Sequence, residues 1–132
     1  MDALKQAALA AVVILALDVP WIAWVMGPRY DAMVKHIQSG RPMVPRLGYA
    51  IPAYLAMVVA VPLFVLPRVR PEWWWQDALL WGGLFGLVLY AVYDFTAAAV
   101  LVDWDLPLAL LDVGWGAALF AVATLAVAAV WR

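Results

Sequence analysis

The stretch that decides the fold is ALLWGGLFGLVLYAVYDFTAAAVLV, residues 78–102, in which Asp94 is the only charged residue. The hydrocarbon core of a bilayer is about 30 Å thick, and a helix needs about 20 apolar residues to cross it. A membrane β-barrel uses shorter segments of alternating hydrophobicity instead. This stretch therefore predicts a transmembrane helix.

Three further stretches have the same character. Residues 7–26 contain Asp18 as their only charged residue, residues 47–66 contain none, and residues 106–131 contain only Asp112. The first stretch is too long for a cleaved signal peptide and has Asp18 inside it, so we expect it to be retained as a helix. The predicted fold class is an all-α membrane protein with four transmembrane helices in an up-down bundle. Residues 1–132 are predicted to form a single membrane domain.

The composition of the whole chain agrees with a membrane protein. Hydrophobic residues make up 69% of the chain and charged residues 13%, against about 45–50% and about 25% in soluble domains. The absence of cysteine excludes a secreted disulfide scaffold. The balance of 8 basic and 9 acidic residues argues against nucleic acid as a partner. The expected partner is the lipid bilayer.

The connection between the first two spans is the longest one and contains a helical pattern. Pro28 suits a first helical position and Gly40 a helix end. Between them one apolar stripe recurs at helical spacing, formed by Tyr30, Met33, Val34 and Ile37. We therefore predict a short amphipathic helix at about residues 28–39, lying in the membrane interface.

The basic residues do not set an orientation. With both termini on one side, each side of the membrane holds four lysines and arginines, and the positive-inside rule returns a tie. Either local determinants fix the orientation, or the chain inserts both ways and forms antiparallel homodimers. Both alternatives stay open.

Three intramembrane acids form the main candidate site. Asp18, Asp94 and Asp112 come from three different spans, and up-down order puts all three about 9–12 Å inside the leaflet that faces the long connection. Ionised carboxylates are costly in hydrocarbon and mark functional sites. We predict that these residues bind a proton, a cation or a polar head group. The alternative is that they are protonated and serve only to fix helix packing.

Aromatic and small residues accompany these acids. Trp21 and Trp115 each follow an aspartate by three residues and share its helix face. The predicted supporting residues are completed by three neighbours of Asp94, namely Tyr90, Tyr93 and Thr96. Helix packing is assigned to a glycine group with GxxxG spacing, formed by Gly82, Gly83 and Gly86.

No metal site is predicted, and no cofactor or catalytic residue is identified. The chain has no cysteine, and its single histidine, His36, falls in the predicted interfacial helix, where a solvated role is expected. An all-oxygen site would favour Mg²⁺, Ca²⁺ or Mn²⁺. The sequence lacks a catalytic triad signature, a P-loop and a dinucleotide-binding fingerprint.

The chain resembles a known family over nearly its whole length. The resembling residues are Leu17-Asp18, Trp21, Tyr30, Gly83-Leu84-Phe85-Gly86-Leu87, Tyr90-Ala91, Tyr93-Asp94-Phe95-Thr96, Trp104 and Asp112-Val113-Gly114-Trp115-Gly116. They are similar to the small bacterial predicted membrane proteins catalogued as domain-of-unknown-function family 2177. The resemblance implies a four-helix, multi-pass protein of the bacterial inner membrane. It brings no assigned reaction or ligand.

Three functions remain open at this point. The first is a proton- or cation-linked transport or sensing module that uses the three aspartates. The second is an enzyme, or an enzyme partner, in membrane-lipid modification. The third is an accessory subunit that docks on a larger membrane complex through the glycine-rich span.

Overall fold

The computed structural model describes residues 2–131, and these residues form helices joined by short connections, with no strand among them. The α-helices are α1 (Asp2–Pro20), α2 (Gly27–Ile37), α3 (Leu47–Ala60), α4 (Trp74–Val100) and α5 (Leu106–Trp131). Two π-helical segments, η1 (Trp21–Met26) and η2 (Val61–Val65), and two short 3₁₀ turns, η3 (Leu66–Arg68) and η4 (Pro71–Trp73), lie between them.

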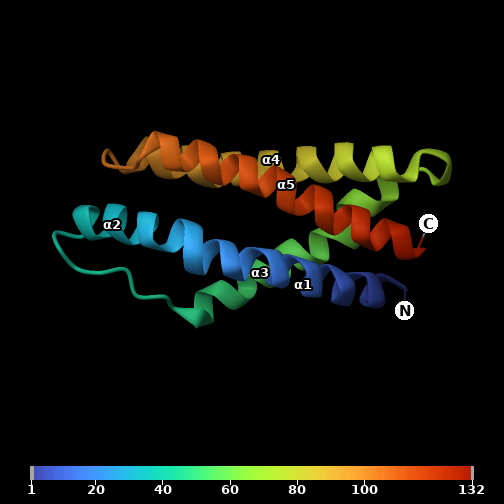
Figure 1. Cartoon of the computed structure of the whole chain (residues 1–132), viewed down its shortest axis with the longest axis horizontal. Helices are drawn as coiled ribbons and strands as arrows, with labels where there is room; N and C mark the ends of the chain where they lie inside the picture. Colours follow the sequence, from blue (N-terminus) through green and yellow to red (C-terminus); the bar gives the residue numbers. More distant parts are fainter. Residues whose placement is uncertain (1, 132) are drawn as a thin grey trace.

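Four helical segments of the described chain are long and apolar enough to cross a membrane. They are Asp2–Ile37, Leu47–Arg68, Pro71–Val100 and Leu106–Trp131. The start of α1 and the end of α5 lie at the same end of the bundle (Figure 1), as an up-down order of four spans requires. The predicted all-α fold with four spans is confirmed.

The first span continues into the predicted amphipathic helix without a break. We expected a boundary near residue 26, but η1 joins α1 directly to α2, and Gly27 keeps helical backbone angles. A proline in the first turn of a helix costs no hydrogen bond, so Pro28 begins α2 without interrupting the helix. The amphipathic helix is therefore the end of a 36-residue helix.

This long helix ends at a Schellman motif. The Gly40 N–H donates to the Lys35 carbonyl at 2.7 Å, and the Ser39 N–H donates to the His36 carbonyl at 3.4 Å, which is the paired bonding of that motif. Ser39 and Gly40 both have positive φ, 58° and 93°. Gly40 thus takes part in the helix end as predicted, while Ser39 occupies the left-handed position that usually holds glycine.

The other spans lie close to their predicted bounds. α5 begins and ends where the fourth span was expected, and α4 begins four residues before residue 78 because the tryptophan run already starts the helix. The second span is α3 followed by η2, and the change of winding occurs at Pro62, which has no N–H to donate.

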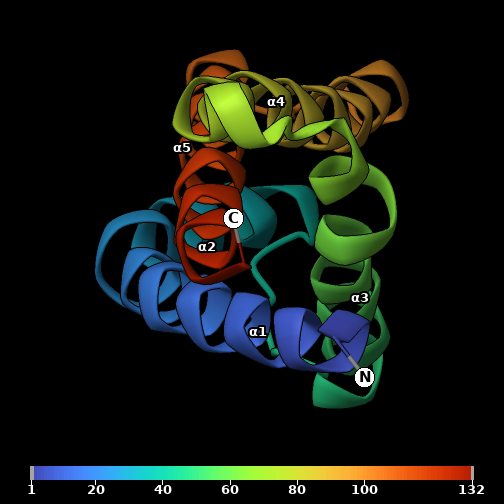
Figure 2. The same ribbon diagram turned by 90° about the vertical axis from the view of Figure 1, so that its right-hand side faces the viewer.

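The helices surround a small core and leave one side loosely packed. α4 and α5 form the most extensive pair, and α1 packs on α5. α3 packs on α1, and its continuation η2 reaches α4 and α5. Figure 2 shows α3 and α5 on opposite sides of the bundle. The core cluster lies where these helices meet and includes Ile14, Val61, Leu119, Phe120 and Val127.

Glycine brings α4 and α5 into backbone contact. A Cβ atom added at Gly82 would lie 2.6 Å from the Phe120 carbonyl oxygen, and one at Gly86 would overlap the Gly116 carbonyl. A Cβ at Gly83 would lie 3.9 Å from its nearest neighbours, an ordinary contact. The close approach expected from the glycine spacing is thus made inside the chain, at Gly82 and Gly86.

Candidate functional site

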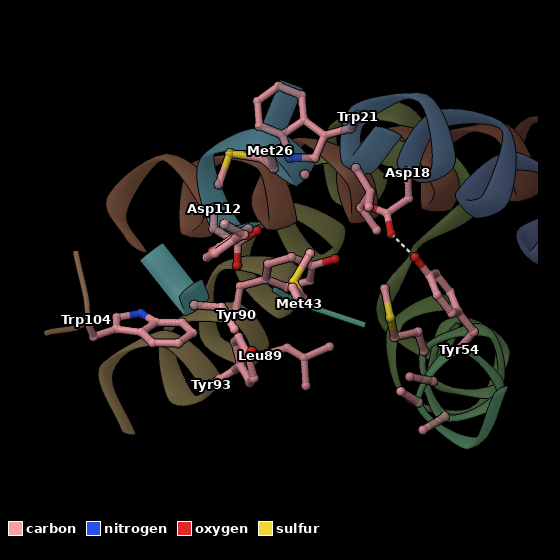
Figure 3. A pocket seen from close by; sticks show the side chains of 18 of the residues that line it. Asp18, Trp21, Met26, Met43, Tyr54, Leu89, Tyr90, Tyr93, Trp104 and Asp112 are labelled. Atoms are coloured by element: carbon pink, nitrogen blue, oxygen red, sulfur yellow. Dashed lines mark hydrogen bonds between the residues drawn. The ribbon is translucent and has the colours of Figure 1, made fainter. Parts of the chain in front are cut away.

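A cavity of about 600 Å³ lies among the helices, on the half of the bundle toward the long connection. Figure 3 shows its side chains from close by. Most of its wall is apolar, and its polar groups are carboxyls, phenols and indoles. The polar and aromatic lining residues are Asp18, Trp21, Tyr30, Tyr54, Phe85, Tyr90, Tyr93, Trp104 and Asp112.

Asp18 is held at one end of this cavity by two neutral donors from other helices. Its Oδ1 accepts a hydrogen bond from the Trp115 Nε1 at 2.8 Å, and its Oδ2 accepts one from the Tyr54 hydroxyl. The side chain is buried. Both carboxylate oxygens are thereby satisfied by α5 and α3 without a basic partner.

Asp94 and Asp112 form a pair of carboxyls at the other end of the cavity. The Tyr30 hydroxyl donates to the Asp94 Oδ1 at 3.3 Å, and Asp94 and Tyr30 are both among the groups that interact with Asp112. Asp94 is fully buried, whereas Asp112 lines the cavity. The Asp94 Oδ2 is buried and has no hydrogen-bond partner among the described residues. Two carboxyls that share a site are unfavourable when both are ionised, and a bound proton or cation relieves this repulsion.

The π-helical segment explains how Tyr30 reaches this pair. Tyr30 follows Asp18 by twelve residues, which in an uninterrupted α-helix would turn it about 120° away from Asp18. A π-helical turn contains one more residue than an α-helical turn. The residues that follow it are therefore rotated back by about 100°, which is the rotation of one residue in an α-helix. Asp18 and Tyr30 consequently face the same cavity from opposite sides of η1.

Glycine at position 27 fits this winding. The Gly27 N–H bonds to the Ile22 carbonyl, five residues earlier, and an added Cβ would collide with that same carbonyl oxygen. Glycine therefore permits the wide turn that aligns the two halves of the long helix.

Three of the five predicted supporting residues line the cavity, and Trp115 lies just outside the lining, where it contacts Asp18 and Trp21. The Trp21 and Trp115 rings stack with centroids 4.3 Å apart and planes at 4°. Tyr90 lies among the acids and interacts electrostatically with all three of them. Tyr93 lines the cavity and meets Trp104 edge-on, with centroids 6.1 Å apart. Thr96 is exposed and lies outside the lining.

Sequence reasoning did not assign four of the aromatic lining residues to the site. Tyr30, Phe85 and Trp104 entered only through the apolar stripe or the family resemblance, and Tyr54 was not singled out at all. One signal was present, because Tyr54 places a hydroxyl in the middle of a span that contains no charged residue. Such a group needs a polar partner inside the membrane, and Asp18 is that partner.

The charged residues that line the cavity are all acidic. Among the described residues no lysine or arginine lines it. The Trp21 and Trp104 indole N–H groups are buried and have no hydrogen-bond partner within residues 2–131. The described residues also include no group of three or more His, Cys, Asp or Glu side chains placed to hold a metal ion.

The remaining polar contacts of note lie outside the cavity. His36 is exposed, with its Nε2 3.7 Å from Asp103 in the connection between α4 and α5. Arg70 pairs with Asp77 through two side-chain bonds of 2.7 and 2.9 Å, and this carboxylate raises the pKa of the Arg70 guanidinium. These pairs join connections to helices and do not contribute to the site.

Comparison with known proteins identifies the family. Residues 3–129 match the family model described as predicted membrane protein (DUF2177). Because the match covers nearly the whole chain, the chain belongs to this family, and the resemblance noted in the sequence is confirmed. No curated protein and no solved structure matches the chain.

Proposed function

We propose that this member of the DUF2177 family is a proton- or cation-linked transport or sensing module of the bacterial inner membrane. Its binding site is the cavity bordered by Asp18, Asp94 and Asp112. One observation carries the proposal, namely that Asp18 and Asp112 line one cavity, that the buried Asp94 interacts with Asp112, and that no basic residue of the described chain lines this cavity. Buried carboxyls without a basic partner bind either protons or cations.

The Asp94–Asp112 pair supplies the exchange step. In this proposal the pair holds one proton in the absence of a cation, because two ionised carboxyls that share a site repel each other. A cation that enters beside Asp112 interacts most favourably with the ionised pair, so its binding releases that proton. Binding of the cation and loss of the proton are thus linked at one place.

Proton release tests this function directly. The protein, in unbuffered detergent solution with a pH-indicator dye, is mixed in turn with Na⁺, K⁺, Mg²⁺ and tetraphenylphosphonium. We expect at least one of these cations to release about one proton per chain, and the Asp94→Asn and Asp112→Asn variants to release none. Asp103→Asn, in the exposed connection, is the matched control and should behave as the wild type. No release by any cation, or equal release from the aspartate variants, would refute the proposal.

Flux then separates transport from sensing. In liposomes with a trapped pH dye, a gradient of the active cation should move protons if the protein is a transporter. Proton release without flux would assign it to sensing. In so short a chain, alternating access would use two copies. Cross-linking in the membrane should then yield a homodimer.

The apolar wall of the cavity keeps membrane-lipid modification as the second candidate function. Lipid extracts from cells with and without the protein should differ if an enzyme or enzyme partner acts on lipid. The accessory-subunit hypothesis has lost its expected surface, since Gly82 and Gly86 already pack against α5. A larger membrane complex that docks on another face would co-purify in mild detergent.

A further inference from the structure

The geometry points to an organic cation with an apolar body as the ligand of this cavity, reaching Asp112 sideways from the bilayer between α3 and α4. This inference rests on the proposed function and specifies its substrate class. It is argued below from charge, from the aromatic wall, from size and from access.

The charge of the cavity selects a cation. Both oxygens of Asp18 are occupied by the neutral Tyr54 and Trp115 donors, and no lysine or arginine of the described residues lines the wall. A negative charge on these acids therefore has no basic partner among the residues that line the cavity. An anionic head group would meet acids and no basic side chain, so phosphate and carboxylate ligands are disfavoured.

The wall favours an organic ion over a bare inorganic one. Seven aromatic residues line the cavity, namely Trp21, Tyr30, Tyr54, Phe85, Tyr90, Tyr93 and Trp104. Aromatic faces bind ammonium-type cations, and quaternary or alkylated ones in particular, because the ring faces are electron-rich. Hard metal cations instead require several oxygen ligands close together.

The size of the cavity also favours an organic cation as the ligand. A volume of about 600 Å³ falls within the range of roughly 300–1,000 Å³ typical of sites for small organic molecules. A single water molecule takes up only about 30 Å³ in the liquid. The cavity therefore has room for an apolar body attached to the charged group, and its mainly apolar wall suits that body.

Access lies between α3 and α4. Lining residues on these two helices have exposed surface, namely Ala53 and Ala56 on α3 and Leu89 and Tyr93 on α4. α3 itself packs on α1, and contact with α4 is made mainly by the segments that follow α3, η2 and η3. The two helices are thus loosely joined beside the cavity, and in a bilayer an amphiphilic cation partitions into the lipid around such spans.

Asp112 is the group that the ligand meets. It lines the cavity, while Asp94, which interacts with it, is fully buried and lies outside the lining. The titratable groups that face Asp112 are Asp94, Tyr90 and Tyr93 on α4, Tyr30 on α2 and Asp18 on α1. Every one of these groups is acidic or neutral.

Two ions of the same shape and opposite charge test this inference. Tetraphenylphosphonium and tetraphenylborate are titrated into the full chain in phosphatidylcholine nanodiscs, and binding is read from quenching of the tryptophan fluorescence. We expect saturable binding of the cation that tightens up to tenfold per pH unit while one proton is displaced, and no saturable binding of the anion. Asp112→Asn should weaken cation binding at least tenfold, and the loop control Asp103→Asn should leave it unchanged.

Two tryptophan substitutions test the proposed access between α3 and α4. Ala56→Trp, at the exposed rim on α3, should slow cation binding several-fold. Ala118→Trp, at an exposed position on α5 outside the lining, should not. Equal rates for both variants would overturn the sideways route.

The possible failures are distinguishable. Equal binding of both ions, or unchanged binding by Asp112→Asn, overturns the assigned ligand class. If the phosphonium does not bind but Na⁺, K⁺ or Mg²⁺ still releases protons in a manner that depends on Asp112, the proposed function stands and the organic ligand is wrong. If no cation releases protons, both proposals fail together.

Discussion

Replacing Gly82 by alanine tests the packing of α4 against α5. The added Cβ would lie 2.6 Å from the Phe120 carbonyl oxygen and 2.7 Å from the Thr124 Oγ1, and ordinary contact begins at 3.4 Å. The two helices therefore have to separate locally by about 0.8 Å. A gap of about 0.5–1 Å forfeits a quarter to a half of the dispersion energy at each contact, and van der Waals packing is a main force that holds membrane helices together.

We expect Gly82→Ala to lower the free energy of unfolding by about 2 kcal/mol, since overpacking typically costs roughly 1–3 kcal/mol. Unfolding is followed by far-ultraviolet circular dichroism in mixed micelles with increasing SDS. Gly83→Ala is the matched control, one position along the same helix. Its Cβ has 3.9 Å of room, and alanine has a better helix propensity by about 1 kcal/mol. The control should be neutral or stabilising. If Gly82→Ala were as stable as Gly83→Ala, the glycine contact would not hold α4 to α5.

Two further predictions concern the long first helix. Ser39→Gly should stabilise the fold by about 1 kcal/mol, because serine is strained at a φ of 58° and glycine is not; a thermal melt without an upward shift would contradict this. Deleting Ala23 from η1 should turn the π-helical segment into regular α-helix with Tyr30 still facing the cavity. The melting temperature should then stay close to that of the wild type. Deletion of Ala91 from α4 is the control, because it turns Asp94 relative to the rest of that helix and should unfold the protein. If both deletions lowered the melting temperature equally, η1 would carry no extra residue.

The spans were predictable because uninterrupted hydrophobic runs of this length have few other stable conformations. The fourth run, residues 106–131, coincides with α5 at both ends. The first span was harder to bound, since Pro20, Gly27 and Pro28 indicate a break when the sequence is read alone. In the structure the helix absorbs these residues by changing its winding at η1. A π-helical turn has no characteristic spacing of hydrophobic residues, so the sequence alone does not reveal it.

The site was predictable only in part for a related reason. Up-down order brings residues of alternate spans to one end of the bundle, so the gathering of Asp18, Asp94 and Asp112 follows from counting along the helices. Which side chains face one another depends on the rotation of each helix. Thr96 follows Asp94 by two residues, and residues at that spacing do not share a helix face; it is exposed. Tyr54 faces Asp18 because of the rotation of α3 about its own axis. The spacing of residues within α3 does not identify Asp18 as the partner of Tyr54.

The unequal lengths of the spans have a consequence for the surrounding lipid. The helix Asp2–Ile37 has 36 residues and Leu47–Arg68 has 22, so at about 1.5 Å per residue they measure roughly 54 and 33 Å. A bilayer adapts to the hydrophobic length of the protein beside it by local thinning or thickening. The hydrophobic lengths are closer than the helix lengths, because the longer helix includes the amphipathic α2 (Gly27–Ile37). The helix Leu47–Arg68 is close to the hydrocarbon thickness of about 30 Å. The bilayer therefore needs little deformation along α3, and the extra length of the first helix places α2 toward the polar side of the membrane.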